Sequence, residues 1–357
     1  LLSADGNYKE LLKQAKLFKV KNLIITNENS YNKVKKDRFS KKINIYNNFN
    51  NLRKIFKKKV DYTMSSITGI EGLKPTLDII KYSKKIAIAN KESIICGWEL
   101  IQKEMKKYKT EFIPVDSEHF SIWSVIKDYD RSDIEKIILT ASGGPFLNKK
   151  IKKNTKIEDA INHPNWQMGK KISVDSSTMM NKVLEVIEAF RLFPFNEKKC
   201  KIVIHSQSLI HAIVFFKNGQ TKLLYHETDM RIPIANAIYE NKIDIENLLV
   251  KKSNFLKNFD YLKFEPVDKK RFPIVTLLRN NIYRNSGPII LNASNEILVD
   301  RFIRNEIQYT QIYQSLKRVF KDRDFHKYAI KKRPNIKEIY KIDKWAREKT
   351  KEIIGFK

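Results

Sequence analysis

The sequence is poor in cysteine, glycine and proline, with 2, 10 and 10 of these among its 357 residues. Two cysteines, Cys96 and Cys200, cannot build a disulfide framework, so we expect a reducing, cytoplasmic environment. Neither lies in a CxxC pattern, which argues against a zinc site. No apolar run is long enough to cross a bilayer, and the first residues lack a signal-peptide pattern. We therefore expect no membrane partner.

Acidic residues are also scarce, with 40 Asp and Glu against 70 Lys and Arg, which gives a formal net charge of +30. Such a charge is typical of proteins that bind nucleic acids or membranes. The basic residues, however, occur in short scattered runs, without an arginine-rich arm, zinc-finger spacing or an RNA-binding aromatic motif. We interpret the charge as lysine enrichment of solvated surfaces and expect no nucleic-acid partner, although it helps to attract an anionic substrate.

Strand-like and helix-like stretches alternate in the first third of the chain. This alternation predicts a parallel sheet with helices on its faces, in which ligands bind beyond the carboxyl ends of the strands. We expect strands at residues 20–26, 60–67, 86–89 and 112–115, and helices at 73–82 and near 97–107.

The rest of the chain mixes element types. A strand at 136–140, a long helix at 178–193 and strands around the hairpin signal Asn218-Gly219 predict an α+β region. A polar stretch at 241–262 is interpreted as a linker, and the patterns after it predict a small helical bundle. The bundle helices are expected at 274–283, 295–304, 312–320 and 336–354.

Asp116-Ser117-Glu118 directly follows the strand expected at 112–115. In an extended segment, residues two apart face the same side, so both carboxylates would point at one place. Two such carboxylates repel each other unless one is protonated or a cation lies between them, and Mg²⁺ or Mn²⁺ prefers such oxygen ligands. Taken alone, the motif is more often a solvated acidic turn.

Asn181, Lys182 and Glu185 form a second polar cluster on one stripe of the long helix. The residues before it, 173–178, are rich in hydroxyl groups, and hydroxyls with free amides at a helix start make a good anion site. Lys182 and Asn181 would complete a phosphate site, and Glu185 would add a third carboxylate to the metal. The alternative is an ordinary surface ion pair.

Two loops add further candidates. Ser142-Gly143-Gly144 leaves a strand, and adjacent glycines in a glycine-poor chain suggest a loop shaped to approach a phosphate, or else a plain tight turn. The stretch 163–169 contains Trp166, which predicts either a lid that closes over a ligand or a loop anchored to the core.

Together these segments resemble the 1-deoxy-D-xylulose 5-phosphate reductoisomerase family over essentially the whole chain. The resemblance implies conversion of 1-deoxy-D-xylulose 5-phosphate to 2-C-methyl-D-erythritol 4-phosphate, with NADPH and Mg²⁺ or Mn²⁺ (Co²⁺ as a possible substitute), by a homodimer of non-mevalonate isoprenoid synthesis. The similar stretches, in the family's order, are IANKES (88–93), PVDSEH (114–119), SGGPF (142–146), HPNWQMGKKISVDSSTMMNK (163–182), LEVIEA (184–189), HSQSLIH (205–211), DMRIPIA (229–235) and LNASNEI (291–297).

The resemblance also implies roles for individual residues. Metal ligands would be Asp116, Glu118 and Glu185; the substrate phosphate would contact Ser142, Ser176, Asn181 and Lys182; the sugar chain would contact Lys91 and Ser117. His163 and Trp166 would belong to the lid. The residues near the nicotinamide would be Asn90, Glu92, Met168 and Gly169. Lys91, Glu118 and His163 are the residues expected to take part in catalysis, while Ser208 and His211 have a less defined substrate-side role.

One family feature is missing. Members begin with a strand and a G-x-T-G-x-x-G turn that holds the cofactor pyrophosphate, whereas this sequence is expected to start at the second strand. Asp5, Gly6 and Asn7 would then lie near the adenosine ribose, with Gly6 where many relatives have a basic residue. A catalytically inactive relative that binds a sugar phosphate and metal is therefore the alternative.

The resemblance completes the expected architecture as an α/β protein of three parts. Residues 1–115 would form an incomplete Rossmann-like parallel-sheet domain that binds NADPH. Residues 116–240 would form a central α+β catalytic and dimerisation domain with a lid near 160–171. After the linker at 241–262, residues 263–357 would form a helical bundle.

Overall fold

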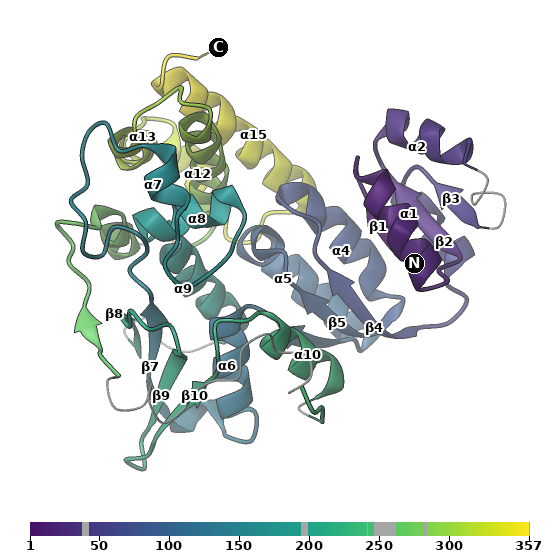
Figure 1. The fold of residues 1–357 in the computed structure, drawn as a ribbon, viewed down its shortest axis with the longest axis horizontal. Helices are drawn as coiled ribbons and strands as arrows, with labels where there is room; N and C mark the ends of the chain where they lie inside the picture. Colours follow the sequence, from purple (N-terminus) through teal and green to yellow (C-terminus); the bar gives the residue numbers. More distant parts are fainter. Residues whose placement is uncertain (38–42, 194–198, 241, 246–261, 281–283, 357) are drawn as a thin grey trace.

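The computed structural model describes residues 1–37, 43–193, 199–240, 242–245, 262–280 and 284–356 (Figure 1). Two parallel three-stranded sheets lie in the first third, a mixed five-stranded sheet lies in the middle, and helices dominate the last part. This arrangement confirms the expected α/β class. No helix within the described ranges has the length and apolar character needed to cross a membrane.

The N-terminal unit alternates strand and helix around its own small core. Its sheet has the order β1-β2-β3, with all pairs parallel, and Leu11, Leu12, Leu23 and Ile25 fill the space between the sheet and its helices. The elements are β1 (Leu2–Ala4), α1 (Tyr8–Leu17), β2 (Asn22–Ile25), α2 (Glu28–Lys35) and β3 (Asn44–Tyr46).

A second parallel sheet, in the order β4-β5-β6, brings three strand ends together. Because all three strands run the same way, the residues that leave their carboxyl ends lie along one edge. The elements are η2 (Phe49–Asn51), α3 (Leu52–Ile55), β4 (Val60–Ser65), η3 (Ile70–Gly72), α4 (Leu73–Ile80), β5 (Ser83–Ile88), α5 (Lys91–Tyr108), β6 (Glu111–Pro114) and α6 (Ser117–Ile126).

The central sheet has the order β10-β9-β7-β8-β11, with β7 and β8 parallel and the other pairs antiparallel. Helices α8 and α9 connect β7 to the rest of this region, and the expected hairpin joins β9 to β10. The elements are η4 (Arg131–Asp133), β7 (Ile134–Ala141), α7 (Ile157–Ile161), α8 (Lys170–Thr178), α9 (Met180–Leu192), β8 (Cys200–Ile204), β9 (Ile210–Phe216), β10 (Thr221–Tyr225), α10 (Arg231–Tyr239) and β11 (Glu265–Pro266).

The C-terminal helices pack against α5, α8 and one another, as the yellow and green ribbons of Figure 1 show. One large apolar core runs from Ile86 of β5 through Leu184 of α9 to Leu298 of α12, across the expected domain boundaries. The elements are η7 (Pro273–Asn280), α12 (Gly287–Ile303), α13 (Tyr309–Phe320), α14 (Phe325–Ala329) and α15 (Ile336–Ile353).

Several boundaries differ from the sequence-based expectation. The helix expected at 178–193 is two helices, because Met179 adopts a left-handed conformation (φ 68°) and ends α8 before α9 begins. The helix expected near 97–107 begins at Lys91, where Asn90 caps it, and is kinked at Gly97. The helix expected at 274–283 is a 3₁₀ helix as far as Asn280, and residues 281–283 and most of the 241–262 linker lie outside the described residues.

Candidate active site

A cavity of about 760 Å³ lies where the ends of β4, β5, β6 and β7 meet α8 and α9. It collects residues from segments far apart in the sequence. The expected metal, phosphate, sugar and nicotinamide residues all line it: Asn90, Lys91, Glu92, Asp116, Ser117, Glu118, Ser142, His163, Trp166, Met168, Gly169, Ser176, Asn181, Lys182 and Glu185, together with Ser208 and His211.

Three carboxylates converge in this cavity. Oxygen atoms of Asp116, Glu118 and Glu185 all lie within 4.8 Å of one another. The sequence suggested that Asp116 and Glu118 lie in an extended segment, but the strand already ends at Pro114. Asp116 instead caps α6, and its carboxylate accepts a hydrogen bond from the backbone N–H of Glu118. Three closely spaced acidic oxygens fit a hard divalent cation such as Mg²⁺ or Mn²⁺.

Two lysines neutralise this acidic cluster. The Lys91 ammonium lies 3.1 Å from Asp116 Oδ2 and 3.3 Å from Glu185 Oε1. Lys182 Nζ lies 2.7 Å from Glu118 Oε1 and 2.5 Å from Glu185 Oε2. Removing one partner from such a buried group leaves an uncompensated charge, so the five side chains act as a unit.

The cluster separates the proton affinities of its members. Burial would raise the pKa of Asp116, but Lys91 and His119 hold that pKa well below its ordinary value. Burial, followed by the neighbouring charge of Glu185, raises the pKa of Glu118 to about 7. Although burial opposes it, the surrounding carboxylates raise the pKa of Lys182 and hold that lysine charged. A carboxyl that titrates near neutrality is suited to proton transfer.

Two neutral side chains complete the cluster. The Ser117 hydroxyl donates to Glu118 Oε2 at 2.6 Å. The Asn181 amide donates to Glu185 Oε1 from one helical turn away and accepts from Lys91 Nζ at 3.1 Å. Both side chains are therefore held by the same carboxylates that they orient.

The break between α8 and α9 creates the helix start that the anion site requires. The hydroxyl-rich residues 173–178 were expected just before a single long helix, but they lie inside α8. The backbone N–H groups of a helix start are therefore those of α9, which begins at Met180. Asn181 and Lys182 stand in the first turn of α9. The turn at Gly144 (φ 63°) packs against α8 so closely that a Cβ there would meet the Ser176 carbonyl oxygen at 2.8 Å.

The 163–169 loop is tied over the cavity by its histidine. His163 Nδ1 accepts from the backbone N–H groups of Asn165 and Trp166, so its Nε2 carries the proton and donates to Ser142 Oγ at 2.9 Å. Burial lowers the pKa of His163 to about 4, which keeps the imidazole neutral near pH 7. Trp166 meets the His211 ring edge-to-face, with 6.0 Å between centroids.

One end of the cavity is built on the start of α5. Asn90 caps that helix through Ser93 and donates to the Gly69 carbonyl oxygen and to Glu92 Oε2, each at 3.0 Å. Lys171 lies 3.5 Å from Glu92 Oε1 and thereby joins α8 to α5. Met168 and Gly169 line the same end.

The cavity does not include Asp5, Gly6 and Asn7, which lie at the carboxyl end of β1. The Asp5 carboxylate accepts from the Thr26 hydroxyl at 2.7 Å, and Asn7 caps α1. Their expected place near the adenosine ribose therefore remains a prediction.

Sequence reasoning missed several residues at this site. Thr68 and Gly69 line the cavity, and their position after a buried strand was the available signal. His119 and Glu188 are buried beside the carboxylates, but neither a lone histidine nor a helical glutamate carries a distinguishing pattern.

A parallel sheet with a cavity at its strand ends, a cluster of acidic and basic side chains inside that cavity and a loop along its wall are features of an α/β enzyme that binds a small ligand. Family models described as 1-deoxy-D-xylulose 5-phosphate reductoisomerase match residues 1–97, and models of its C-terminal domains match residues 112–193 and 226–349. The chain belongs to the 1-deoxy-D-xylulose 5-phosphate reductoisomerase family.

Individual relatives carry the same description. The enzyme of Pelagibacter ubique is 48% identical over 351 residues, covering 97% of this chain and 90% of that protein. The enzyme of a Wolbachia strain from Drosophila simulans is 40% identical over 319 residues, covering 88% of this chain and 80% of that protein. The family resemblance seen in the motifs is thereby confirmed.

Solved structures agree with this assignment. A reductoisomerase crystallised with NADPH, fosmidomycin and magnesium superposes with a TM-score of 0.90 at 31% identity, covering 99% of this chain and 90% of the other. The Zymomonas mobilis enzyme in complex with NADPH gives a TM-score of 0.87 at 30% identity, covering 99% and 91%.

Proposed function

We propose that this chain converts 1-deoxy-D-xylulose 5-phosphate to 2-C-methyl-D-erythritol 4-phosphate, using NADPH and a divalent metal ion, in non-mevalonate isoprenoid synthesis. The observation that carries the proposal is the convergence of Asp116, Glu118 and Glu185 in one cavity with the start of α9. Family membership supplies the identity of the substrate and product. The residues expected on the nicotinamide side, Asn90, Glu92, Met168 and Gly169, line the same cavity, which supports the enzyme over an inactive relative that binds only the sugar phosphate and metal.

The three carboxylates would hold Mg²⁺ or Mn²⁺, with Co²⁺ as a possible substitute. Magnesium is present in the solved relative with fosmidomycin. When bound, such an ion polarises the oxygens of a substrate and stabilises negative charge on them. Glu118 has its pKa raised to about 7 without the ion, and a bound dication would lower that pKa and hold the carboxylate ionised as a ligand.

The substrate phosphate would bind at the start of α9. Asn181 and Lys182 stand in its first turn, and Ser142 and Ser176 add hydroxyl groups from the facing turn and helix. A helix start offers free backbone amides and a positive dipole end, both of which favour a phosphate. Lys91 and Ser117, which contact the carboxylates of the acidic cluster, would contact the sugar chain.

The 163–169 loop would exclude water from the bound substrate. Trp166 supplies a large apolar surface over the cavity, and His163 fixes the loop to Ser142 through a hydrogen bond. Phosphate binding at Ser142 would therefore change the hydrogen bond that holds the loop. In this way, binding energy from the phosphate, far from the reacting carbons, would help the loop to close over the substrate.

NADPH would place its nicotinamide beside Asn90, Glu92, Met168 and Gly169, which line the cavity near the starts of α5 and α8. The Zymomonas mobilis relative is described in complex with NADPH. Asp5, Gly6 and Asn7 would lie on the adenosine side, at the carboxyl end of β1. Because Gly6 offers no side chain to a ribose phosphate, selectivity for NADPH over NADH would rest on other residues.

We further propose a cytoplasmic homodimer in which the β9–β10 hairpin and α10 take part in the interface. Leu223 of β10 is 42% exposed, and Ile238 and Tyr239 of α10 are 42% and 54% exposed. Large apolar side chains left exposed on these elements favour a protein contact. Light scattering of the purified protein would test the dimer. We also propose the three-part division that the resemblance implies, although the separate N-terminal core reaches only to Ile45 and the main core joins the rest of the first part to the other two.

The decisive experiment follows NADPH absorbance with 1-deoxy-D-xylulose 5-phosphate and Mn²⁺. We expect turnover by the natural protein and a loss of about 100-fold or more in Glu185→Gln, because one charged metal ligand is removed. Glu99→Gln, which alters a carboxylate 3.5 Å from Arg191 outside the cavity, is the matched control and should stay active. A folded natural protein without turnover, or metal-dependent turnover that is unchanged in Glu185→Gln, would contradict the proposal.

A further inference from the structure

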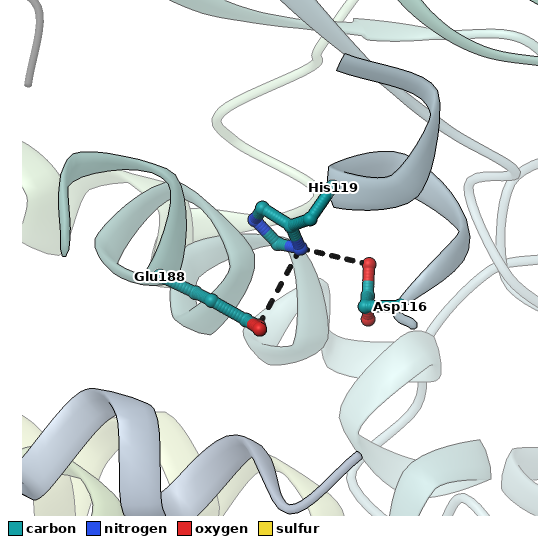
Figure 2. A group of neighbouring side chains, drawn as sticks. All are labelled: Asp116, His119 and Glu188. Atoms are coloured by element: carbon teal, nitrogen blue, oxygen red, sulfur yellow. Dashed lines mark hydrogen bonds and ion pairs between the residues drawn. The ribbon is translucent and has the colours of Figure 1, made fainter. Parts of the chain in front are cut away.

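A buried histidine lies directly behind the acidic cluster, between Asp116 and Glu188 (Figure 2). The His119 side chain is fully buried, and its Nδ1 lies 2.9 Å from Asp116 Oδ1 and 3.5 Å from Glu188 Oε2. The ring also stacks on Phe193, with 6.3 Å between centroids. The imidazole is therefore held in one orientation by its packing.

The two ring nitrogens of His119 join two different elements. Nε2 lies 2.9 Å from the backbone carbonyl oxygen of Glu185 in α9, and a carbonyl oxygen only accepts, so Nε2 donates. Nδ1 faces the carboxylate of Asp116, which caps α6. His119 thus fixes the side chain of one expected metal ligand against the backbone of another.

Glu188 is the third member of this group. Its side chain is 3% exposed, and its Oε2 makes no hydrogen bond although it is buried and aimed at His119 Nδ1. It follows Glu185 by three residues on α9, so both carboxylates project toward α6 from the same side of that helix. A buried carboxylate without a hydrogen bond is costly unless it balances a nearby positive charge.

We propose that Glu188 is a positioning residue which, through His119, holds Asp116 and Glu185 at the spacing that a divalent cation requires. The inference rests on the proposed metal site. Groups behind a metal's direct ligands orient those ligands, and their loss typically weakens metal binding by about 10- to 100-fold. Glu188 does not line the cavity, so it does not touch substrate or cofactor.

The same three side chains also lie close enough to hold a second ion, since ligand atoms of Asp116, His119 and Glu188 are within 4.8 Å of one another. The hydrogen bonds favour positioning over a second site. With Nε2 donating to a carbonyl and Nδ1 facing an ionised carboxylate, both ring nitrogens act as donors and neither offers a lone pair to a metal.

The test is titration calorimetry with Mn²⁺ alone, without substrate or NADPH, on the natural protein and its variants. We expect one ion per chain in the natural protein, with affinity about 10- to 100-fold weaker in Glu188→Ala. Glu188→Gln should fall between them, because it keeps the size and polarity of the side chain beside Nδ1 while the charge is lost. Circular dichroism and thermal melting establish that each variant is folded, and Glu188→Gln, which keeps the shape of the side chain, carries the test if the alanine variant unfolds.

The matched control is Asp343→Asn, which removes the charge of a buried carboxylate that pairs with Arg347 on α15. It should bind Mn²⁺ as the natural protein does. Natural affinity in the folded Glu188 variants, or two ions per chain in the natural protein, would overturn the positioning role. A natural protein that binds no Mn²⁺ would overturn the metal site and this inference together, which distinguishes the two failures.

Discussion

His163 connects the loop over the cavity to the phosphate side through both of its ring nitrogens. Nδ1 accepts two backbone N–H groups of its own loop, and Nε2 donates to Ser142 Oγ. This arrangement requires the neutral ring, because a protonated Nδ1 has no lone pair to offer. Protonation of one side chain would therefore remove two hydrogen bonds from the loop.

The pH dependence follows from the direction of the pKa shift. Burial lowers the pKa of His163 from 6.5 to about 4, so the unfolded chain takes up this proton at higher pH than the folded one. The stabilising contribution is complete above about pH 6.5 and is lost as the pH falls toward 4. Urea unfolding at about pH 7.5 and 5 should show a larger loss of stability in the natural protein than in His163→Asn. Equal losses would contradict the neutral-ring assignment.

Individual site residues differed in how well the sequence revealed them. Asp116 and Glu118 were predicted because two acids follow a buried strand, although the geometry that joins them is a helix cap. Glu185 was placed by its helical spacing from Asn181. His119 and Glu188 carry no such signal, because what they do depends on contact between α6 and α9 rather than on neighbours in the sequence.

At the scale of elements, the contact between the turn after β7 and the end of α8 sets the shape of the phosphate side. Gly144 has a positive φ of 63°, and a Cβ there would lie 2.8 Å from the Ser176 carbonyl oxygen. Two separate constraints, backbone conformation and space, thus select glycine at this position.

Gly144→Ala should therefore lower the free energy of unfolding by more than the cost of an alanine at positive φ, because the added Cβ also meets the Ser176 carbonyl oxygen. Gly219→Ala is the matched control, because Gly219 has a φ of 84° and a Cβ added there would meet no atom within 4 Å. We expect the control to cost about 1–2 kcal/mol, the usual penalty for an L-residue in this region, and Gly144→Ala to cost clearly more. Urea unfolding measures both. Equal costs would show that Ser176 moves aside freely.

Element boundaries were predicted least well where polar residues form helices. The helix in this region was expected to begin only at residue 178, because serine, threonine and aspartate favour caps and turns, yet tertiary packing places residues 173–178 in α8. Asp175, for example, is 1% exposed and accepts from Asn295 of α12 at 2.7 Å. Strands 60–65, 111–114 and 210–216 were placed within a few residues, and the apolar run of 210–216 is almost wholly buried.

Across the whole molecule, the formal charge of +30 coexists with a large apolar core and a separate N-terminal one. Close pairing neutralises the buried lysines of the site, so the excess positive charge lies mainly at the surface. Like charges spread over a compact body repel one another and reduce its stability, and salt screens this repulsion.

Raising sodium chloride from about 10 to 300 mM should therefore raise the melting temperature, because the screening length shortens from about 30 Å to below 10 Å. Differential scanning fluorimetry in a fixed buffer measures this shift, with an uncharged osmolyte such as sucrose at matched osmolality as the control. A melting temperature that falls with salt would indicate that attractive ion pairs outweigh the net repulsion.

The lysines inside the acidic cluster couple the binding of the metal ion to the binding of the substrate. Lys91 and Lys182 already balance Asp116, Glu118 and Glu185, so an arriving dication competes with ammonium groups for the same oxygens. Each ammonium released in that exchange becomes a receptor for an anion in the same chamber. Occupancy by the cation and by an esterified sugar should thus reinforce each other, and reciprocity requires the gain to be equal in both directions.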